Sequence, residues 1–210
     1  MTHIHSVIIS FNRLELLQRC YASYKATVSV PHTLVIVDNA SRNDTRKWLT
    51  AEVSPEDGVI FLEQNRFPGY ACNRGWEAMP SETTHLHRSD NDFVFLPGWC
   101  EEVLNCFTRG VGQVGLRTKK EEMNAQSNVG GNNAILRELW DQGLRYDERP
   151  WGDQYPPGWT EDSLLSPAVV KMGYRWRRVK HPCIMPISSE DPNDPYYQET
   201  WRVRGIKPPA

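Results

Sequence analysis

The chain has 210 residues, of which 39% are hydrophobic and 24% charged, and this predicts a soluble globular protein with one main domain. Twenty-four Lys and Arg against 26 Asp and Glu leave a formal charge of −2, so the overall charge gives no reason to expect nucleic acid or an acidic membrane as a partner. No apolar run approaches the ~20 residues of a membrane-spanning helix. The first residues lack the charged and apolar regions of a signal peptide, and we expect a cytoplasmic protein.

The cysteines are scattered along the chain, odd in number and never arranged as a CxxC pair. They are Cys20, Cys72, Cys100, Cys106 and Cys183. This pattern favours neither a zinc site nor a disulfide framework. We expect reduced and mostly buried thiols.

The first half of the chain alternates short apolar runs with segments of helical spacing. The expected strands cover residues 7–9, 34–37 and 59–62, and the expected helices cover residues 14–24, 46–53 and 72–79. This order predicts a parallel sheet with helices on both faces. In such sheets ligands bind beyond the carboxyl ends of the strands.

Polar side chains gather where these strands end. They are Ser10, Asn12, Arg13, Asp38, Asn65, Asp90, Asn91 and Asp92. Asp90 and Asp92 are one residue apart between a half-polar segment (84–88) and an apolar one (93–96), so we expect a tight turn between two strands. Their carboxylates suit Mg²⁺ or Mn²⁺, and such an ion suits a diphosphate, although Asp and Asn are also ordinary turn residues.

The second half is less regular. In chain order we expect a helix over 99–107, a strand over 111–116, a polar loop over 119–129, a structured loop over 147–159, a helix over 161–172 and a basic strand over 174–180. Apolar residues at positions 135–140 recur at helical spacing, and Gly143 is a plausible stop for that helix. Pro167 should break or kink the helix in which it lies. We expect a domain over residues 1–187 and a polar, Pro-rich tail over 188–210.

Two further segments offer contacts to a nucleotide. The carboxylate of Asp38 could accept hydrogen bonds from a base or a ribose, or it could be a helix cap or turn residue. Arg74 ends the glycine-containing segment 65–75 and could contact phosphate, or it could be a solvated helix residue.

Other residues could contact an anion, a sugar or a hydroxyl group. Gly131 and Asn132 precede the helix expected at 135–140, so their backbone N–H groups could face an anion or a sugar hydroxyl, or they could form a flexible helix entry. Glu161 and Asp162 open a helix as caps or dipole partners, or one of them is a general base for a hydroxyl. Trp159 could stack on a sugar ring, although buried packing is the commoner role of tryptophan.

Taken in order, these pieces resemble glycosyltransferase family 2, whose members have the GT-A fold. The resemblance runs from about residue 6 to residue 181. It rests on segments 7–13, 35–41, 65–75, 90–92 (similar to the DxD motif of the family), 96–99, 130–132 and 160–162.

The resemblance implies a single GT-A α/β/α sandwich with a mostly parallel central sheet. It implies an enzyme that moves a sugar from a nucleoside-diphosphate sugar, with a UDP-sugar favoured, to an acceptor hydroxyl with inversion, using Mn²⁺ or Mg²⁺. Donor contacts would come from Ser10, Asn12, Arg13, Asp38, Asn65, Arg74, Asp90 and Asn91. Metal ligands would be Asp92 directly, Asp90 and, at a position where several relatives place a late ligand, His181. Asp162 would deprotonate the acceptor beside Glu161, and acceptor contacts would come from Gly131, Asn132 and Trp159.

The sequence departs from the family pattern at Arg66 and Phe67, which occupy the first Asn-x-Gly, and at Pro167 inside the last helix. One alternative is a non-catalytic nucleotide-sugar-binding protein, against which the presence of Asp90, Asp92 and Asp162 argues. The other is a nucleotidyltransferase, which would more naturally show a basic, Gly-rich loop near the N-terminus.

Overall fold

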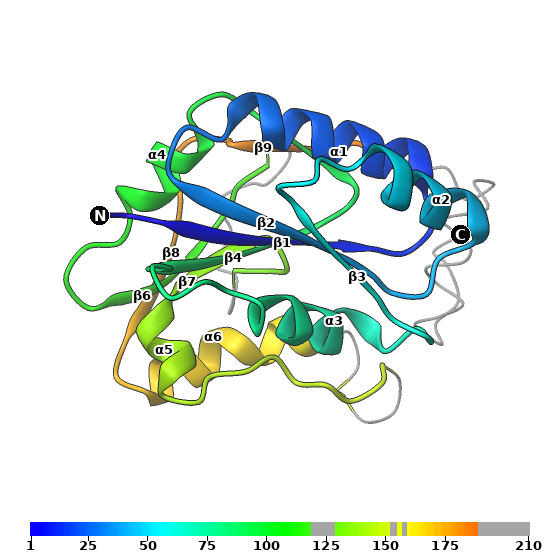
Figure 1. The fold of residues 1–210 in the computed structure, drawn as a ribbon. Coiled ribbons are helices and arrows are strands. Elements are labelled where there is room, and N and C mark those ends of the chain that lie inside the picture. The colour runs from blue at the N-terminus through cyan, green and yellow to red at the C-terminus, as the bar shows by residue number, and fades with distance from the viewer. Residues whose placement is uncertain (119–128, 152–154, 157–158, 189–210) are drawn as a thin grey trace, which may run out of the picture.

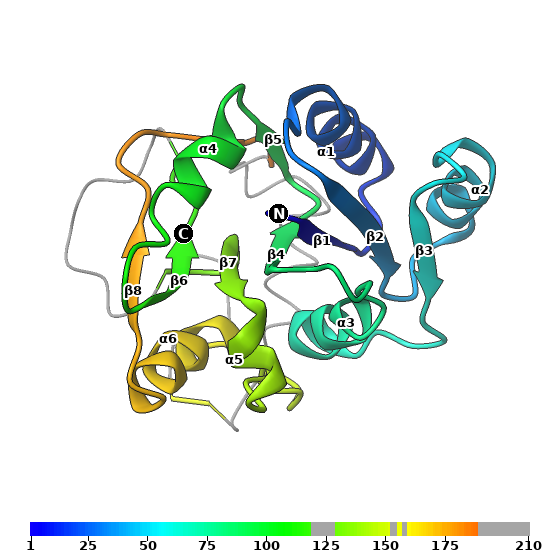
Figure 2. The same cartoon turned by 60° about the vertical axis from the view of Figure 1, so that its left-hand side comes forward.

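The computed structural model describes residues 1–118, 129–151, 155–156 and 159–188. Their centre is a seven-stranded sheet of order β3-β2-β1-β4-β7-β6-β8 (Figures 1 and 2). The strands are β1 Ile4–Ser10, β2 His32–Asp38, β3 Gly58–Phe61, β4 His85–Asp90, β6 Val111–Gly115, β7 Asn133–Leu136 and β8 Arg175–Arg178. Only β7 runs antiparallel to its neighbours, which confirms the mostly parallel sheet.

Helices cover both faces of the sheet. The helices α1 Leu14–Thr27, α2 Asn43–Glu52 and α4 Trp99–Leu104 lie on one side, and α3 Phe67–Trp76, α5 Arg137–Asp141 and α6 Glu161–Lys171 lie on the other (Figure 1). This is the predicted three-layer α/β/α sandwich, and it matches the GT-A fold. No helix among the described residues is long and apolar enough to cross a membrane.

The apolar runs form strands because each of them fills two cores. Along β1, Ile4 and Ile8 belong to the core under α1, α2 and α4, whereas Val7 and Ile9 belong to the core over α3, α5 and α6. Side chains alternate between the faces of a strand, so a strand covered on both sides contains consecutive apolar residues. Gly75 lets α3 approach closely, since a Cβ there would lie 2.5 Å from a methyl carbon of Val7.

A second, two-stranded sheet pairs β5 Phe93–Phe95 with β9 Ile184–Pro186 in antiparallel register. It packs against α1. Because β5 follows β4 after two residues, the turn that carries Asn91 and Asp92 joins the two sheets, as the sequence predicts. The five cysteines form no disulfide, and four of them are buried.

The prediction of a helix over residues 135–140 is wrong for its first half. Residues 133–136 form β7, which pairs with both β4 and β6, and only then does the short α5 begin. Short apolar runs suit a buried strand as well as a helix, and here sheet pairing buries Ala134 and Ile135 completely. Gly131 and Asn132 therefore lead into a strand, not into a helix N-terminus.

Two further expectations need correction. Helix α3 begins at Phe67, well before the expected start at residue 72, with Pro68 in its first turn. Of the two effects expected of Pro167, the break does not occur, since α6 continues to Lys171. Burial of Leu165 and Val169 on the same helix stabilises it against the lost hydrogen bond. The expected loop 119–129 and tail 188–210 lie outside the described residues, apart from Val129 and Ser188.

Candidate active site

Three polar residues lie where neighbouring strands end. Ser10 is paired in register with Asp38 of β2, and the residue before it, Ile9, is paired with Asp90 of β4. Adjacent strands lie about 4.8 Å apart, so these residues form one cluster at the carboxyl edge of the sheet. The side-chain amide of Asn91 donates to the carbonyl of Asn12 at 3.2 Å and joins the Asp90 turn to the loop after β1.

The backbone at this edge is strained at four non-glycine residues. Asn12, Arg13, Ala40 and Phe67 have φ values of 55°, 56°, 65° and 64°. Side chains disfavour this left-handed region, and residues held there gather at binding sites. All four follow the carboxyl ends of β1, β2 and β3, which marks the edge as the candidate site.

Asp38 is completely buried at the end of β2. Its carboxylate accepts the backbone N–H of Ser41 at 3.2 Å and faces the guanidinium of Arg46 at 3.4 Å. Burial raises the pKa of Asp38, and the contacts with Ser41 and Arg46 oppose this rise. Beside it, the Ser10 hydroxyl is buried without a hydrogen-bond partner among the described residues, and such a group is free to bind a ligand.

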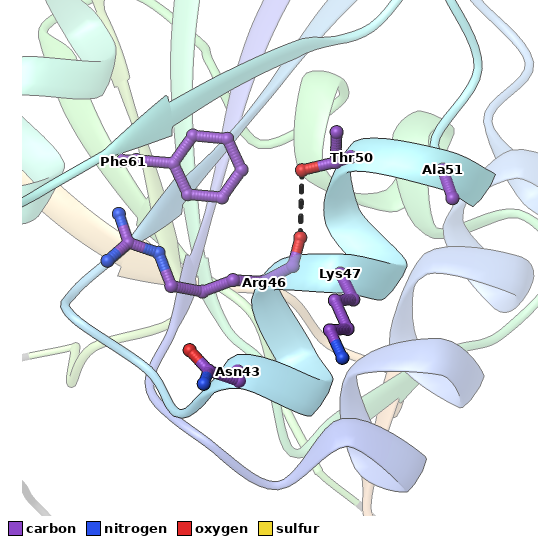
Figure 3. A pocket seen from close by; sticks show the side chains of 6 residues that line it. All are labelled: Asn43, Arg46, Lys47, Thr50, Ala51 and Phe61. Atoms are coloured by element: carbon purple, nitrogen blue, oxygen red, sulfur yellow. Dashed lines mark hydrogen bonds between the residues drawn. The ribbon is translucent and has the colours of Figure 1, made fainter.

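Arg46 also lines a shallow hollow on the outside of α2. Its guanidinium lies 5.0 Å from the centre of the Phe61 ring, and Figure 3 shows the two side chains next to each other. Asn43, Lys47, Thr50 and Ala51 line the rest of the hollow. Arg46 was not predicted from the sequence, because nothing in its helical spacing distinguishes it from a solvated residue.

The two acids of the turn have different environments. Asp92 is 18% exposed and forms an ion pair with Arg13 at 3.1 Å, whereas Asp90 is 38% exposed. Burial first, and then the charge of Asp90, raise the pKa of Asp92 to about 6, and Arg13 opposes the rise. The negative charge on Asp92 is thus incompletely compensated, as expected of a carboxylate that binds a cation.

Gly131 and Asn132 lie directly against this turn. The side-chain oxygen of Asn132 accepts hydrogen bonds from the Ser89 hydroxyl at 2.9 Å and from the Asp90 backbone N–H at 3.2 Å. A Cβ on Gly131 would lie 3.1 Å from an Asp90 carboxylate oxygen. Asn132 therefore fixes the position of Asp90, and Gly131 leaves room for its carboxylate. From the sequence, we expected both residues to contact the acceptor.

Glu161 and Asp162 begin α6 in contrasting surroundings. Glu161 is buried and accepts hydrogen bonds from Arg88 at 2.8 Å and from the Trp151 indole at 2.6 Å. Burial raises the pKa of Glu161, and Arg88 opposes this. Asp162 is only partly buried and accepts hydrogen bonds from the hydroxyls of Thr160 and Ser163. Asp162 is therefore the more accessible acid of the two.

The structure does not bring His181 to the acidic turn. His181 is 63% exposed, and its ring pairs with Glu102 at 3.0 Å. The Ile187 N–H donates to the Asp92 carbonyl at one end of the β5–β9 sheet, and the Leu96 N–H donates to the Cys183 carbonyl at the other. His181 lies beyond that second end, so the length of the β5–β9 sheet separates it from Asp92.

Two other predicted residues have local partners, and a third is exposed. Arg74 lies seven residues into α3, ~10 Å along the helix from its start, and pairs with Glu77 and Glu148. Asn65 braces the loop after β3 by accepting from the Asn39 side chain at 3.1 Å and from the backbone N–H of residue 67 at 2.9 Å. Trp159 is 40% exposed just before α6, which leaves its ring accessible.

No group of three or more His, Cys, Asp and Glu side chains in the described part of the chain could hold a metal ion. The donor set at the turn is two carboxylates, which suits a hard cation that takes its remaining ligands from a substrate or water. Asp90 and Asp92 therefore fit Mg²⁺ or Mn²⁺ better than a softer metal.

Comparison with known proteins identifies the family of the chain. The model of the family described as Glycosyl transferase family 2 matches residues 6–159, and Glu161 and Asp162 lie just beyond the match. No curated protein matches the chain significantly.

Solved structures share the fold at low identity. A mannosyltransferase from Pyrobaculum calidifontis, solved with GDP-Man and Mn²⁺, has a TM-score of 0.72 and 18% identity over 96% of this chain and 60% of its own. S. aureus TarS 1–349 with UDP-GlcNAc has a TM-score of 0.67 and 14% identity over 97% of this chain and 64% of its own. The chain thus spans under two thirds of these relatives. Since the family model covers most of the sequence, the chain belongs to glycosyl transferase family 2.

Proposed function

We propose that the chain is a metal-dependent inverting glycosyltransferase, which transfers a sugar from a nucleoside-diphosphate sugar to an acceptor hydroxyl. One observation carries the proposal. Asp38, Asp90 and Asp92 lie at one edge of the sheet, and Arg88 joins Asp90 to the start of the helix that bears Asp162. Nucleoside-binding, metal-binding and base groups are thus parts of one site.

Asp38 and Ser10 bind the nucleoside in this proposal. A buried carboxylate that accepts hydrogen bonds suits the N–H of a base or the hydroxyls of a ribose. The unpartnered Ser10 hydroxyl gains a partner when the donor binds. Their place in register at the carboxyl ends of β1 and β2 is where an open α/β sheet binds its ligand.

Asp92 and Asp90 hold Mn²⁺ or Mg²⁺ together with the diphosphate of the donor. Among the described residues, four carboxylates and two guanidinium groups lie in this region, which is an excess of two negative charges. The groups are Asp90, Asp92, Glu161, Asp162, Arg13 and Arg88. A divalent cation matches this imbalance, and when bound it neutralises charge that develops on the departing diphosphate. Arg13, 3.1 Å from Asp92, lies close enough to contact the same phosphates.

Asp162 receives the proton of the acceptor hydroxyl. Glu161 is a poor candidate for the base because its carboxylate is buried and bound by Arg88 and Trp151. A base on one side of the sugar and a leaving group stabilised on the other correspond to a single displacement with inversion. The exposed ring of Trp159, three residues before Asp162, offers an apolar face to the acceptor.

A screen of nucleotide sugars with and without Mn²⁺ tests the proposal. We expect at least one UDP- or GDP-sugar to raise the Tm only with metal and to be hydrolysed slowly. NMR should show that the released sugar has the anomeric configuration opposite to that of the donor. The matched control is Asp141→Ala, which removes an exposed carboxylate that pairs with Arg137 on α5. Absence of any metal-dependent stabilisation across the panel would refute the proposal.

A further inference from the structure

Arg88 is a charged residue in the interior of the sheet. It lies on β4, two residues before Asp90, and its side chain is only 2% exposed. Its Nε and Nη1 are buried without a hydrogen-bond partner among the described residues. Burying a donor group without a partner destabilises the folded protein. An arginine kept at this cost within the site requires an explanation beyond packing.

The third nitrogen of the guanidinium joins two acids. Nη2 lies 2.8 Å from a carboxylate oxygen of Glu161 and 3.3 Å from one of Asp90. Glu161 begins α6 directly before Asp162, whereas Asp90 ends β4 directly before the turn with Asp92. One side chain therefore connects the metal-binding turn with the helix that carries the proposed base.

The guanidinium is itself held in place. It lies over the ring of Tyr146, 4.6 Å from the ring centre. The Tyr146 hydroxyl accepts from the Asn133 side chain at 2.7 Å, and the Tyr146 backbone exchanges two hydrogen bonds with the Asn73 side chain at 2.9 and 3.1 Å. Because β7 and α3 both fix Tyr146, Arg88 has little freedom to move away from its two acids.

Space around the ion pairs of Arg88 with Asp90 and Glu161 is also restricted. A Cβ on Gly131 would lie 3.3 Å from Nη2 of Arg88 and 3.1 Å from Asp90. The Trp151 indole also donates a hydrogen bond to the second oxygen of Glu161. Of the three side chains, Arg88 and Glu161 are buried, whereas Asp90 is 38% exposed.

We propose that Arg88 is a positioning residue, which holds the carboxylate of Asp90 and the start of α6 at a fixed separation so that the metal and acceptor sides of the site are aligned. This inference rests on the proposed function. Arginine suits the role better than lysine, because its planar group keeps a fixed geometry towards two carboxylates.

A set of variants separates this role from simple stabilisation. Arg88→Met leaves Glu161 as an unpaired buried charge and should destabilise the fold. The double variant Arg88→Met with Glu161→Gln removes both charges, and such replacements often restore stability. Arg88→Lys keeps the charge but loses the planar geometry. The control is Arg137→Met, which removes an arginine that ties α5 to backbone carbonyls at the opposite edge of the sheet.

The readouts are the Tm and the calorimetric affinity for Mn²⁺ with UDP or GDP, whichever binds the wild-type protein. We expect the double variant to regain most of the Tm lost in Arg88→Met while its Mn²⁺ affinity stays about 10- to 100-fold below wild type, as for the loss of other groups that orient metal ligands. Arg88→Lys should be intermediate, and Arg137→Met should bind as wild type does.

Normal Mn²⁺ affinity in a stable double variant would overturn the inference and leave Arg88 with a structural role alone. Arg88→Met that folds and binds as the wild type does would overturn it equally. Failure of the wild-type protein to bind either nucleotide with Mn²⁺ would instead refute the proposed function, and the inference would fall with it.

Discussion

Asp92 should make the metal-free protein less stable than it would be with a neutral side chain at this position. Its carboxylate lies partly buried beside Asp90, and this environment raises its pKa from 3.8 to about 6. Between these two pH values the folded protein holds a proton that the unfolded chain has lost. Stability therefore falls as the pH rises through this interval, and the loss is complete above about pH 6.

The expected loss follows from the width of the interval. Each pH unit between 3.8 and about 6 removes ~1.4 kcal/mol, so ionisation of Asp92 costs about 3 kcal/mol at neutral pH. Asp92→Asn removes this ionisation and keeps an oxygen that can accept from Arg13. The variant should be more stable than the wild type by about 3 kcal/mol at pH 7.5, and the gain should vanish near pH 4.

Urea unfolding in EDTA at pH 4, 5, 6 and 7.5 measures this difference directly. Titrating groups that do not interact with Asp92 are common to both proteins and cancel in the comparison. The control, Asp141→Asn, removes an exposed carboxylate and should change stability by no more than about 0.5 kcal/mol. A gain that is the same at every pH, or a loss at pH 7.5, would show that the environment of Asp92 is not the one described.

Three further predictions concern the base, the turn and the core. Asp162→Asn should keep metal-dependent donor binding by calorimetry and lose transfer, and unchanged transfer would exclude Asp162 as the base. Gly131→Ala should lower the affinity for Mn²⁺ about 10-fold with little change in Tm, because its Cβ would displace the Asp90 carboxylate. An affinity equal to that of the wild type in a metal titration would contradict this. Burial lowers the pKa of His87 to about 3, so between that value and 6.5 only the unfolded chain binds the proton. The free energy of unfolding should therefore fall as the pH is lowered from 6.5, by about 2 kcal/mol at pH 5. In urea unfolding, His87→Gln should lose this part of the pH dependence.

The sequence predicts those features whose signals are local. The runs that became β1 and β2 are apolar throughout, and the polar residues that follow them mark the carboxyl edge of the sheet. The turn between β4 and β5 is readable because Asp90 and Asp92 interrupt two strand-like segments. Each of these inferences needs only residues that are near in sequence, and each is confirmed as an element of the fold.

The remaining features depend on contacts between distant segments. Arg88 and Glu161 are 73 positions apart, and no local pattern announces their pairing. The strand β7 is recognisable only through its two neighbours, since its apolar spacing also suits a helix. His181 has a suitable position in sequence order, yet the register of β5 and β9 keeps it away from Asp92.

Metal dependence of donor binding tests the central claim most directly. Calorimetry should show that the wild-type protein binds a UDP- or GDP-sugar with Mn²⁺, that EDTA abolishes this binding, and that Asp92→Ala does not bind even with Mn²⁺. A nucleotide sugar has no terminal phosphate group with a pKa near 6, whose titration would overlap with that of Asp92. Equal binding of the donor by wild type and Asp92→Ala, or by wild type with and without metal, would contradict the account.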